Sequence, residues 1–208
     1  NPHFLYNTMD MINWMALQGQ TDEISHAVQS LSRFYKLTLS RKKGISTIAK
    51  EEEHVSIYVH LQNMRYHDSI SFISDIPDEL MEYQIPKLTL QPVVENAVNH
   101  GIRNIDWEGH IDLSVERWND HIEISVRDNG LGMTGEQIQR VLSKKVHSSS
   151  GEGDSTGIGM NNVISRLELY YERDGLMEIY SEGEGMGTEV VINIPLERSE
   201  KNVQNPDC

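Results

Sequence analysis

The chain has 208 residues, with 18 basic and 32 acidic side chains and a formal net charge of −14. This balance excludes a general nucleic-acid-binding protein, because phosphate backbones bind basic surfaces. The one cysteine, Cys208, excludes a disulfide within the chain and a cysteine-based zinc site. Residues 1–43 carry five basic and three acidic side chains, whereas residues 44–208 carry 13 and 29. This uneven charge predicts two units with different roles.

The sequence gives no sign of membrane insertion. No apolar run approaches the ~20 residues that a membrane-spanning helix needs, and the start of the chain has no signal-peptide pattern. The sequence begins at Asn1, without Met, inside a segment with helical periodicity. We therefore interpret it as a fragment of a longer protein, and we expect this fragment to make no membrane contact.

Two amphipathic helices are predicted at the start of the chain, because apolar residues recur at three- and four-residue steps over residues 3–18 and again over residues 24–39. Gly19 is expected to end the first helix and Thr21 to begin the second. Helices joined by so short a turn form an antiparallel hairpin. Its apolar stripe is wider than two helices can bury against each other, so we expect a homodimer through this hairpin.

The rest of the chain alternates between helical and strand patterns. Further helices are predicted over residues 50–66, 88–100, 136–142 and 160–171, and strands over residues 69–74, 111–116, 121–127, 177–181 and 188–195. Residues 143–157 are rich in Ser and Gly and are expected to form a loop. The predicted fold class is α+β, with an α/β sandwich that has a mixed sheet and helices on one face. Its parts are a helical hairpin (1–43), a connecting helix (44–69), the sandwich domain (70–197) and a disordered tail (198–208).

Two glycine-rich segments stand beside regular elements. Asp128-Asn-Gly-Leu-Gly-Met133 follows a strand, and its glycines allow the backbone to approach a flat ligand. Ser155-Thr-Gly-Ile-Gly-Met-Asn-Asn162 opens a helix, where free backbone N–H groups favour an anion. Taken alone, the first fits an ordinary turn equally well. The second does not match a dinucleotide-binding motif, and the chain contains no P-loop.

Two further segments carry polar residues in suitable places. Glu95, Asn96, Asn99 and His100 lie on the otherwise apolar helix predicted over residues 88–100. An amide oxygen is a suitable ligand for Mg²⁺, although helix capping before Gly101 is an alternative. The segment Gly183-Glu-Gly-Met-Gly-Thr188 precedes a strand and by itself is only a flexible turn.

Together, the order and spacing of these four segments over residues 88–195 resemble the N, G1, G2 and G3 boxes of the GHKL ATPase superfamily. The resemblance implies that Asp128 binds the adenine amino group, that Asn96 binds Mg²⁺ and that residues 134–156 form a lid. It implies that Thr188 closes the adenine end of the site. It also implies ATP contacts for Asn99, His100, Gly130, Gly132, Met133, Gly157, Ile158, Gly159 and Met160. Pro92 replaces the catalytic Glu of gyrase-like ATPases, which disfavours that class, and position 99 departs from the Lys that is common in relatives.

The first residues, Asn1-Pro-His-Phe-Leu-Tyr-Asn7, resemble the phosphoacceptor motif of LytS/YesM-type sensor histidine kinases. The resemblance implies that His3 accepts the γ-phosphoryl group of ATP. Asn7 lies one helical turn later on the same face and is expected to orient the His3 ring. Phe4 stands where many histidine kinases carry an acidic base, so we expect transfer to depend on positioning and on Mg²⁺. Glu95 is a further candidate catalytic residue.

The resemblance implies the cytoplasmic kinase core of a sensor anchored in the inner or plasma membrane. ATP would phosphorylate His3, and an aspartate of a response regulator would then take the phosphoryl group. Two alternatives stay open. One is another GHKL enzyme, either a serine kinase or an ATP hydrolase. The other is a non-catalytic pseudokinase that binds ATP without transferring phosphate.

Overall fold

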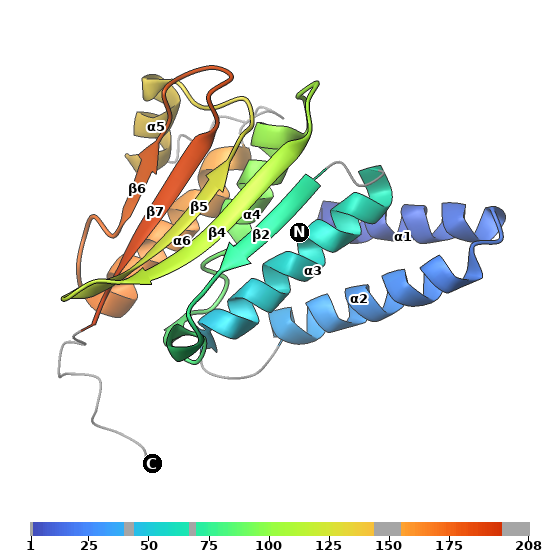
Figure 1. The fold of residues 1–208 in the computed structure, drawn as a ribbon, viewed down its shortest axis with the longest axis horizontal. Helices are drawn as coiled ribbons and strands as arrows, with labels where there is room; N and C mark the ends of the chain where they lie inside the picture. The colour runs from blue at the N-terminus through green and yellow to red at the C-terminus, as the bar shows by residue number, and fades with distance from the viewer. Residues whose placement is uncertain (1, 40–43, 67–69, 144–154, 197–208) are drawn as a thin grey trace, which may run out of the picture.

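A computed structural model describes residues 2–39, 44–66, 70–143 and 155–196. Three helices, α1 (Pro2–Leu17), α2 (Thr21–Leu39) and α3 (Ile48–Tyr66), lie along one edge of a five-stranded sheet (Figure 1). The turn between α1 and α2 contains Gly19 with a φ of 71°, a left-handed conformation that glycine adopts without a steric penalty. The predicted helical hairpin is therefore present, with its turn at the expected residue.

Helix α3 packs on the hairpin through a cluster of aromatic side chains. The ring centroid of Phe4 in α1 lies 4.9 Å from that of Phe34 in α2 and 5.0 Å from that of Tyr58 in α3. The Phe34 ring also stacks on buried His54, at 4.2 Å. Close aromatic pairs of this kind add to the free energy of apolar burial. The apolar stripe of the hairpin is thus covered in part by the third helix.

The sheet has the strand order β2-β4-β5-β7-β6, in which β2 and β4 are parallel and every other pair is antiparallel. In β4, Ile111, Leu113 and Val115 are buried while the alternate His110 and Asp112 are exposed, the pattern of a sheet with one buried face. The strands are β2 (Ile70–Asp75), β4 (Gly109–Arg117), β5 (His121–Asp128), β6 (Met177–Tyr180) and β7 (Thr188–Pro195).

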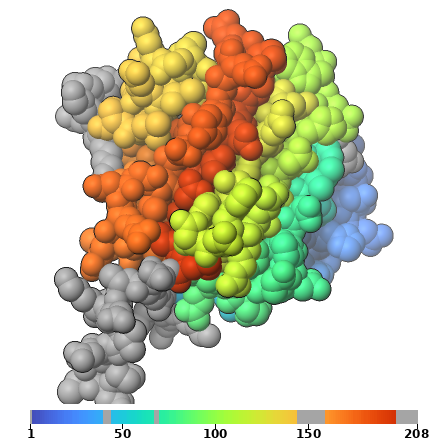
Figure 2. Space-filling view, turned by 60° about the vertical axis from the view of Figure 1, so that its left-hand side comes forward, coloured from blue at the N-terminus to red at the C-terminus, as the bar shows by residue number. Residues whose placement is uncertain are grey.

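Helices α4 (Gln91–Asn96) and α6 (Ser155–Tyr171) lie behind the sheet (Figure 1), and the strands themselves form the surface of the opposite face (Figure 2). The short helix α5 (Gly135–Leu142) begins with a capping box between Thr134 and Gln137, which satisfies two free N–H groups. The α+β class and the mixed sheet agree with the sequence-based prediction.

Several boundaries differ from the prediction. The single helix predicted over residues 88–100 is divided into α4 and a π-helical segment, η2 (Ala97–Ile102). Two short strands that the sequence did not indicate, β1 (Ile45–Thr47) and β3 (Gln84–Pro86), form an antiparallel pair. The expected turn near Pro77 contains the 3₁₀ helix η1 (Asp78–Leu80). The predicted loop over 143–157 is wrong at its end, because α6 begins at Ser155. The rest of that loop, apart from residue 143, and the tail from residue 198 lie outside the described residues.

A buried carboxylate in α3 holds the segment that leads into α4. Glu51 accepts hydrogen bonds from the backbone N–H groups of Leu88 (3.0 Å), Thr89 (2.9 Å) and Leu90 (3.3 Å). Leu88 has a φ of 59°, which is rare for a residue with a side chain. Burial raises the pKa of Glu51, and these three hydrogen bonds oppose that rise. Glu51 therefore fixes an unusual backbone turn directly before the helix that carries Asn96.

Replacing Glu51 by alanine is expected to lower the free energy of unfolding by about 3 kcal/mol, because the N–H donors at residues 88–90 lose their charged acceptor. Denaturant unfolding measures this loss. The matched control, E79A, removes an exposed carboxylate and should change stability by less than about 0.5 kcal/mol. Equal stability of the two variants would contradict the role of Glu51.

Candidate functional site

Asp128 lies at the end of β5, in register with Thr188 of β7. Both residues are buried, and one carboxylate oxygen, Oδ1, accepts the backbone N–H of Gly130 at 2.8 Å. Burial raises the pKa of Asp128 to about 6, although hydrogen bonds from the Gly130 and Thr188 backbone oppose this shift. A carboxylate has about four lone-pair sites, so Asp128 can still accept a hydrogen bond from a ligand beside those from the Gly130 and Thr188 backbone.

Glycines allow three chain segments to close around Asp128. A Cβ atom at Gly130 would lie 2.2 Å from the carbonyl carbon of Gly101, and one at Gly187 would lie 2.1 Å from the backbone oxygen of Asp128. Real side chains do not tolerate such distances, so these positions require glycine. The backbone N–H of Leu131 donates to Gly101 (2.9 Å), and that of Gly187 donates to Gly130 (3.0 Å). The predicted site residues Asp128, Gly130 and Thr188 are thus brought together.

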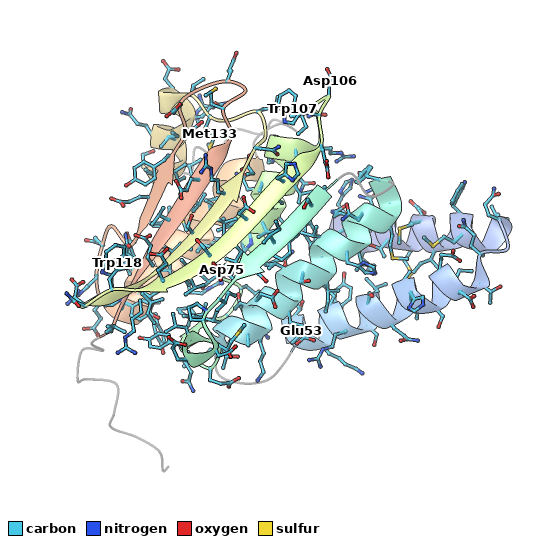
Figure 3. The ribbon with its side chains drawn as sticks, in the orientation of Figure 1. Glu53, Asp75, Asp106, Trp107, Trp118 and Met133 are labelled. Carbon is cyan, nitrogen blue, oxygen red and sulfur yellow. The ribbon has the colours of Figure 1, made fainter. Side chains whose placement is uncertain are left out.

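Gly132 and Met133 continue the chain segment that begins at Asp128. Gly132 has a φ of 74°, and a Cβ there would lie 2.1 Å from the backbone oxygen of Gly183. The Met133 backbone N–H donates to the Ser181 hydroxyl at 2.9 Å. Met133 and Trp107 lie at the same end of the sheet, and Trp118 lies at the opposite end (Figure 3). The loop after β5 is therefore tied to the turn between β6 and β7 at the end of the sheet where Asp128 lies.

The helical segments behind the sheet carry amide oxygens without partners. The Oδ1 atoms of Asn96 and Asn161 and the Oε1 atom of Gln91 are buried and accept no hydrogen bond. A buried acceptor without a partner is costly, and a hard cation or a ligand donor would remove that cost. On this observation, Asn96 fits the Mg²⁺ ligand that the sequence predicted. Glu95 beside it accepts a hydrogen bond from the Gln91 side chain at 3.3 Å.

The predicted G2 residues Gly157, Ile158, Gly159 and Met160 all lie in the first two turns of α6. The sequence placed Gly157 in a loop before the helix, which is corrected here. Residues 155–158 still supply the four N–H groups that a helix leaves unpaired at its start. A Cβ at Gly159 would lie 3.5 Å from the Cβ of Pro92. The beginning of α6 therefore lies against the beginning of α4.

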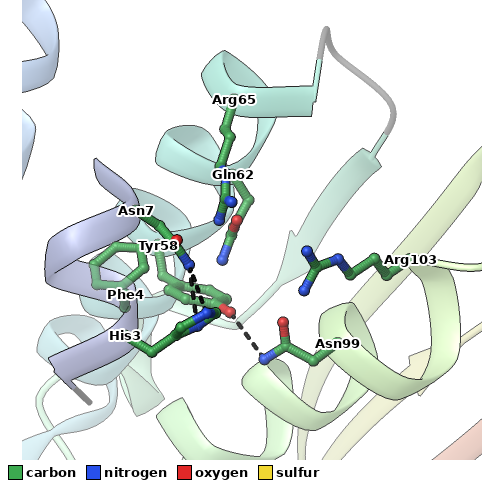
Figure 4. A pocket seen from close by; sticks show the side chains of 8 residues that line it. All are labelled: His3, Phe4, Asn7, Tyr58, Gln62, Arg65, Asn99 and Arg103. Carbon is green, nitrogen blue, oxygen red and sulfur yellow. Dashed lines mark hydrogen bonds between the residues drawn. The ribbon is translucent and has the colours of Figure 1, made fainter. Parts of the chain in front are cut away.

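His3 lies in a second cluster, between α1, α3 and η2 (Figure 4). The Nδ2 atom of Asn7 lies 3.0 Å from Nδ1 and 3.3 Å from Nε2 of the exposed His3 ring. On the other side, Asn99 donates through Nδ2 to the Tyr58 hydroxyl at 3.5 Å. His3, Asn7 and Asn99 line one hollow of about 20 Å³, together with Phe4, Tyr58, Gln62, Arg65 and Arg103. The predicted phosphoacceptor thus faces a residue of the predicted nucleotide site.

His100, the last of the predicted nucleotide contacts, is exposed on η2, and burial of part of its ring lowers its pKa. It does not line the hollow that Asn99 lines.

The sequence did not indicate four further side chains that line this hollow, namely Tyr58, Gln62, Arg65 and Arg103, which come from α3 and the end of η2. Gly101 follows the helix predicted over residues 88–100 and Gly187 lies in the segment 183–188, but the sequence predicted no role for either glycine. The structure places Gly101 against Gly130 and Asp128, and Gly187 against Asp128.

Two negative observations apply to the part of the chain that is described. No group of three or more His, Cys, Asp or Glu side chains there is arranged to hold a metal ion. None of the helices in these residues is both long and apolar enough to cross a membrane.

Comparison with known proteins identifies the two parts of the chain. Residues 1–70 match the family model "Histidine kinase", and residues 86–198 match "Histidine kinase-, DNA gyrase B-, and HSP90-like ATPase". The sensor histidine kinase YesM of Bacillus subtilis is 37% identical over 94% of this chain, and BtsS of Escherichia coli is 30% identical over 94%. In both cases the chain covers 32% of the relative, so it spans about a third of their length.

Solved structures share the fold. The histidine kinase domain from the Erythrobacter litoralis EL346 blue-light activated histidine kinase aligns with a TM-score of 0.52 at 17% identity, over 90% of this chain and 83% of that one. The mycobacterial sensor histidine kinase MprB gives a TM-score of 0.52 at 16% identity, over 73% and 95%. With both family models matched in order along the sequence, the chain belongs to the LytS/YesM-type sensor histidine kinases and forms the catalytic core of such an enzyme.

Proposed function

We propose that this core phosphorylates His3 with Mg·ATP and then passes the phosphoryl group to an aspartate of a response regulator. The observation that carries the proposal is that His3 of α1 and Asn99 of η2 line the same hollow (Figure 4). Asn99 is one turn after Asn96, whose buried oxygen lacks a partner. The closeness of His3 and Asn99 in one chain supports transfer inside one subunit.

The contact between Asn7 and His3 prepares the ring for attack. An amide side chain can present either its nitrogen or its oxygen, since the two are distinguished only by their hydrogen bonds. When the Asn7 oxygen faces Nδ1, that nitrogen carries the proton and Nε2 keeps its lone pair. Asn7 cannot accept the proton itself, so its role is orientation of the ring.

Each part of the nucleotide has a matching group. The Asp128 carboxylate would accept a hydrogen bond from the exocyclic amino group of adenine in addition to those from the Gly130 and Thr188 backbone, whereas the keto oxygen of guanine would face it unfavourably. The tight contacts at Gly130 and Gly187 hold their chain segments beside Asp128, where the backbone could approach a flat base. Asn96 would bind Mg²⁺, which neutralises phosphate charge when bound. The free N–H groups at the start of α6 would hold phosphate oxygens.

Incubation of the purified chain with γ-labelled ATP and Mg²⁺ tests the proposal. The label should be acid-labile and alkali-stable, as a phosphoramidate is, and it should be absent from H3Q. The matched control H60Q, which changes an exposed histidine of α3, should keep the label. Label that resists acid would indicate a serine kinase. Nucleotide binding without any label would indicate a pseudokinase, and either result would overturn the proposal.

We also propose a homodimer formed through the hairpin. Although α3 covers one side of it, several large apolar side chains of α1 and α2 remain about half exposed or more, namely Tyr6, Met9, Trp14, Leu17, Val28 and Leu39. Such a set on two adjacent helices is typical of a buried interface. Residues 1–43, which include this hairpin, carry more basic than acidic side chains, whereas the rest of the chain is acidic. The hairpin therefore suits an acidic surface of a response regulator.

Sedimentation should therefore show a dimer for the unmodified chain and a monomer for M9E/L17E, because two buried carboxylates would disrupt an apolar interface. The matched control L169E places a charge at an exposed apolar position of α6 and should stay dimeric. A monomeric wild-type chain, or a dimeric M9E/L17E chain, would disprove this interface.

The affinity for ADP is expected to depend on pH through Asp128. Its pKa in the free protein is about 6, and the adenine amino group binds the ionised form. Affinity should therefore be constant well above pH 6 and should fall as the pH drops through that value, by up to tenfold for each pH unit. Calorimetric titration across this range measures the effect. Affinity that stays flat below pH 6 would show that Asp128 does not bind the base.

As for its setting, we propose that the core is the cytoplasmic part of a membrane-anchored sensor. The support is the similarity to YesM and BtsS, of which this chain matches about a third.

A further inference from the structure

The hollow beside His3 has a wall of basic side chains that the proposed mechanism does not use. Arg65 lies in the last turn of α3, and Arg103 follows η2 directly. Figure 4 shows both side chains pointing toward the hollow, Arg65 from α3 and Arg103 from the side across from α1. Their guanidinium carbons lie 4.9 Å and 5.3 Å from the ring centroid of the same residue, Tyr66. Both positive charges therefore lie beside the same ring, and both side chains line the same hollow.

Two neighbouring cations repel each other unless an anion lies between them. Among the described residues, neither arginine has an ion pair with a carboxylate, since the pairs found there are Arg33–Glu53 and His121–Asp120. The hollow is lined by no Asp or Glu, although the chain as a whole carries a net charge of −14. A site with two cations and no anion in so acidic a protein favours an anionic ligand.

The other lining groups are uncharged or can donate hydrogen bonds. Burial raises the pKa of Tyr58, which keeps its hydroxyl neutral. Gln62, Asn99 and Asn7 offer amide N–H groups. The hollow of about 20 Å³ holds roughly one water molecule, so a larger anion would extend from it toward the exposed side chain of Arg103. A guanidinium group can donate two parallel N–H···O hydrogen bonds to two oxygens of one phosphoryl group.

We propose that Arg65 and Arg103 bind the phosphoryl group while His3 carries it. This rests on the proposed function. In the step, the lone pair of a His3 ring nitrogen forms a bond to the γ-phosphorus, and the bond from that phosphorus to the bridging oxygen breaks. ADP leaves with this electron pair, and the proton of the other ring nitrogen passes to water. The arginines stabilise the product, so they shift the equilibrium toward phosphohistidine.

The first measurement is the plateau of labelled His3 at a fixed ratio of ATP to ADP. Each of R65Q and R103Q removes one charge and should lower the phosphohistidine-to-histidine ratio about 10-fold or more, since hydrogen bonds to charged groups have that strength. R65K and R103K, which keep the positive charge, should recover part of the lost phosphohistidine-to-histidine ratio. R117Q, an equal charge change at the exposed end of β4, should match the wild type. ADP affinity, which involves no γ-phosphoryl group, should be unchanged in all variants and confirms folding.

The second measurement avoids ATP. Phosphoramidate phosphorylates histidine directly, and H3Q treated in the same way reports the contribution of the other histidines. Phosphorylation of His3 should raise the melting temperature of the wild type, because the bound phosphoryl group links α1 to α3 and η2. It should not do so in R65Q/R103Q. An equal rise in both chains, or an unchanged plateau in the double variant, would overturn this inference. Failure of ATP to label His3, with the phosphoramidate effect intact, would instead reject the proposed function alone.

Discussion

The D128N variant is expected to bind ADP about 10- to 100-fold more weakly than the wild type, the range for losing one hydrogen bond to a charged group. The carboxylate of Asp128 has two acceptor oxygens, and one already accepts the Gly130 N–H at 2.8 Å. An amide has a single acceptor oxygen. If that oxygen keeps the Gly130 contact, the amide NH₂ faces the adenine amino group, and two donors then oppose each other.

Selectivity between bases makes this prediction sharper. The introduced NH₂ group would suit the keto oxygen of guanine, so the preference for ADP over GDP should shrink in D128N along with the loss of affinity. The matched control D112N changes an exposed carboxylate on β4 and should keep both the affinity and the preference. An unchanged ratio of ADP to GDP binding in D128N would place the base elsewhere.

The N96A variant is expected to lose at least about 100-fold of the labelling rate, because the removed amide oxygen is the proposed protein ligand of the ion that neutralises phosphate charge. Its binding of ADP in the absence of Mg²⁺ should change little, since the base contacts come from Asp128 and its glycine neighbours. The matched control N104A alters an exposed amide just after η2 and should label normally. Wild-type labelling by N96A would remove Asn96 from the site.

The sequence predicted best those features that depend on residues close together along the chain. Gly19 ends the first helix because a left-handed residue is needed there, and the alternating residues of β4 and β5 predict the hairpin that they form. The division of the helix over residues 88–100 was not predictable. The π-helical segment 97–102 has the same local composition as an α-helix, and its packing against β5, with Gly101 beside Asp128, is a tertiary contact.

The candidate site divides in the same way. Motif spacing predicted Asp128, Gly130 and Asn96 as site residues, because acidic, glycine and amide residues at fixed intervals carry a specific pattern, and the structure brings Asp128 and Gly130 into contact. The spacing predicted no role for Gly101 or Gly187. These positions have little space for a side chain because they lie against Asp128 and Gly130, and only the structure shows this contact. Arg65 and Arg103 are far apart in sequence and meet only over the Tyr66 ring, a tertiary contact that no local pattern contains.

In the proposed mechanism, His3 receives its phosphoryl group from the nucleotide site of its own chain. A mixture of wild-type chains and size-tagged N96A chains tests it directly, after the two have exchanged partners and been given γ-labelled ATP and Mg²⁺. The wild-type chain supplies an internal positive control, and N96A supplies an intact His3 without a working site. The geometry predicts label on the wild-type chain alone. Label on His3 of the N96A chain would show transfer between subunits and would contradict the account.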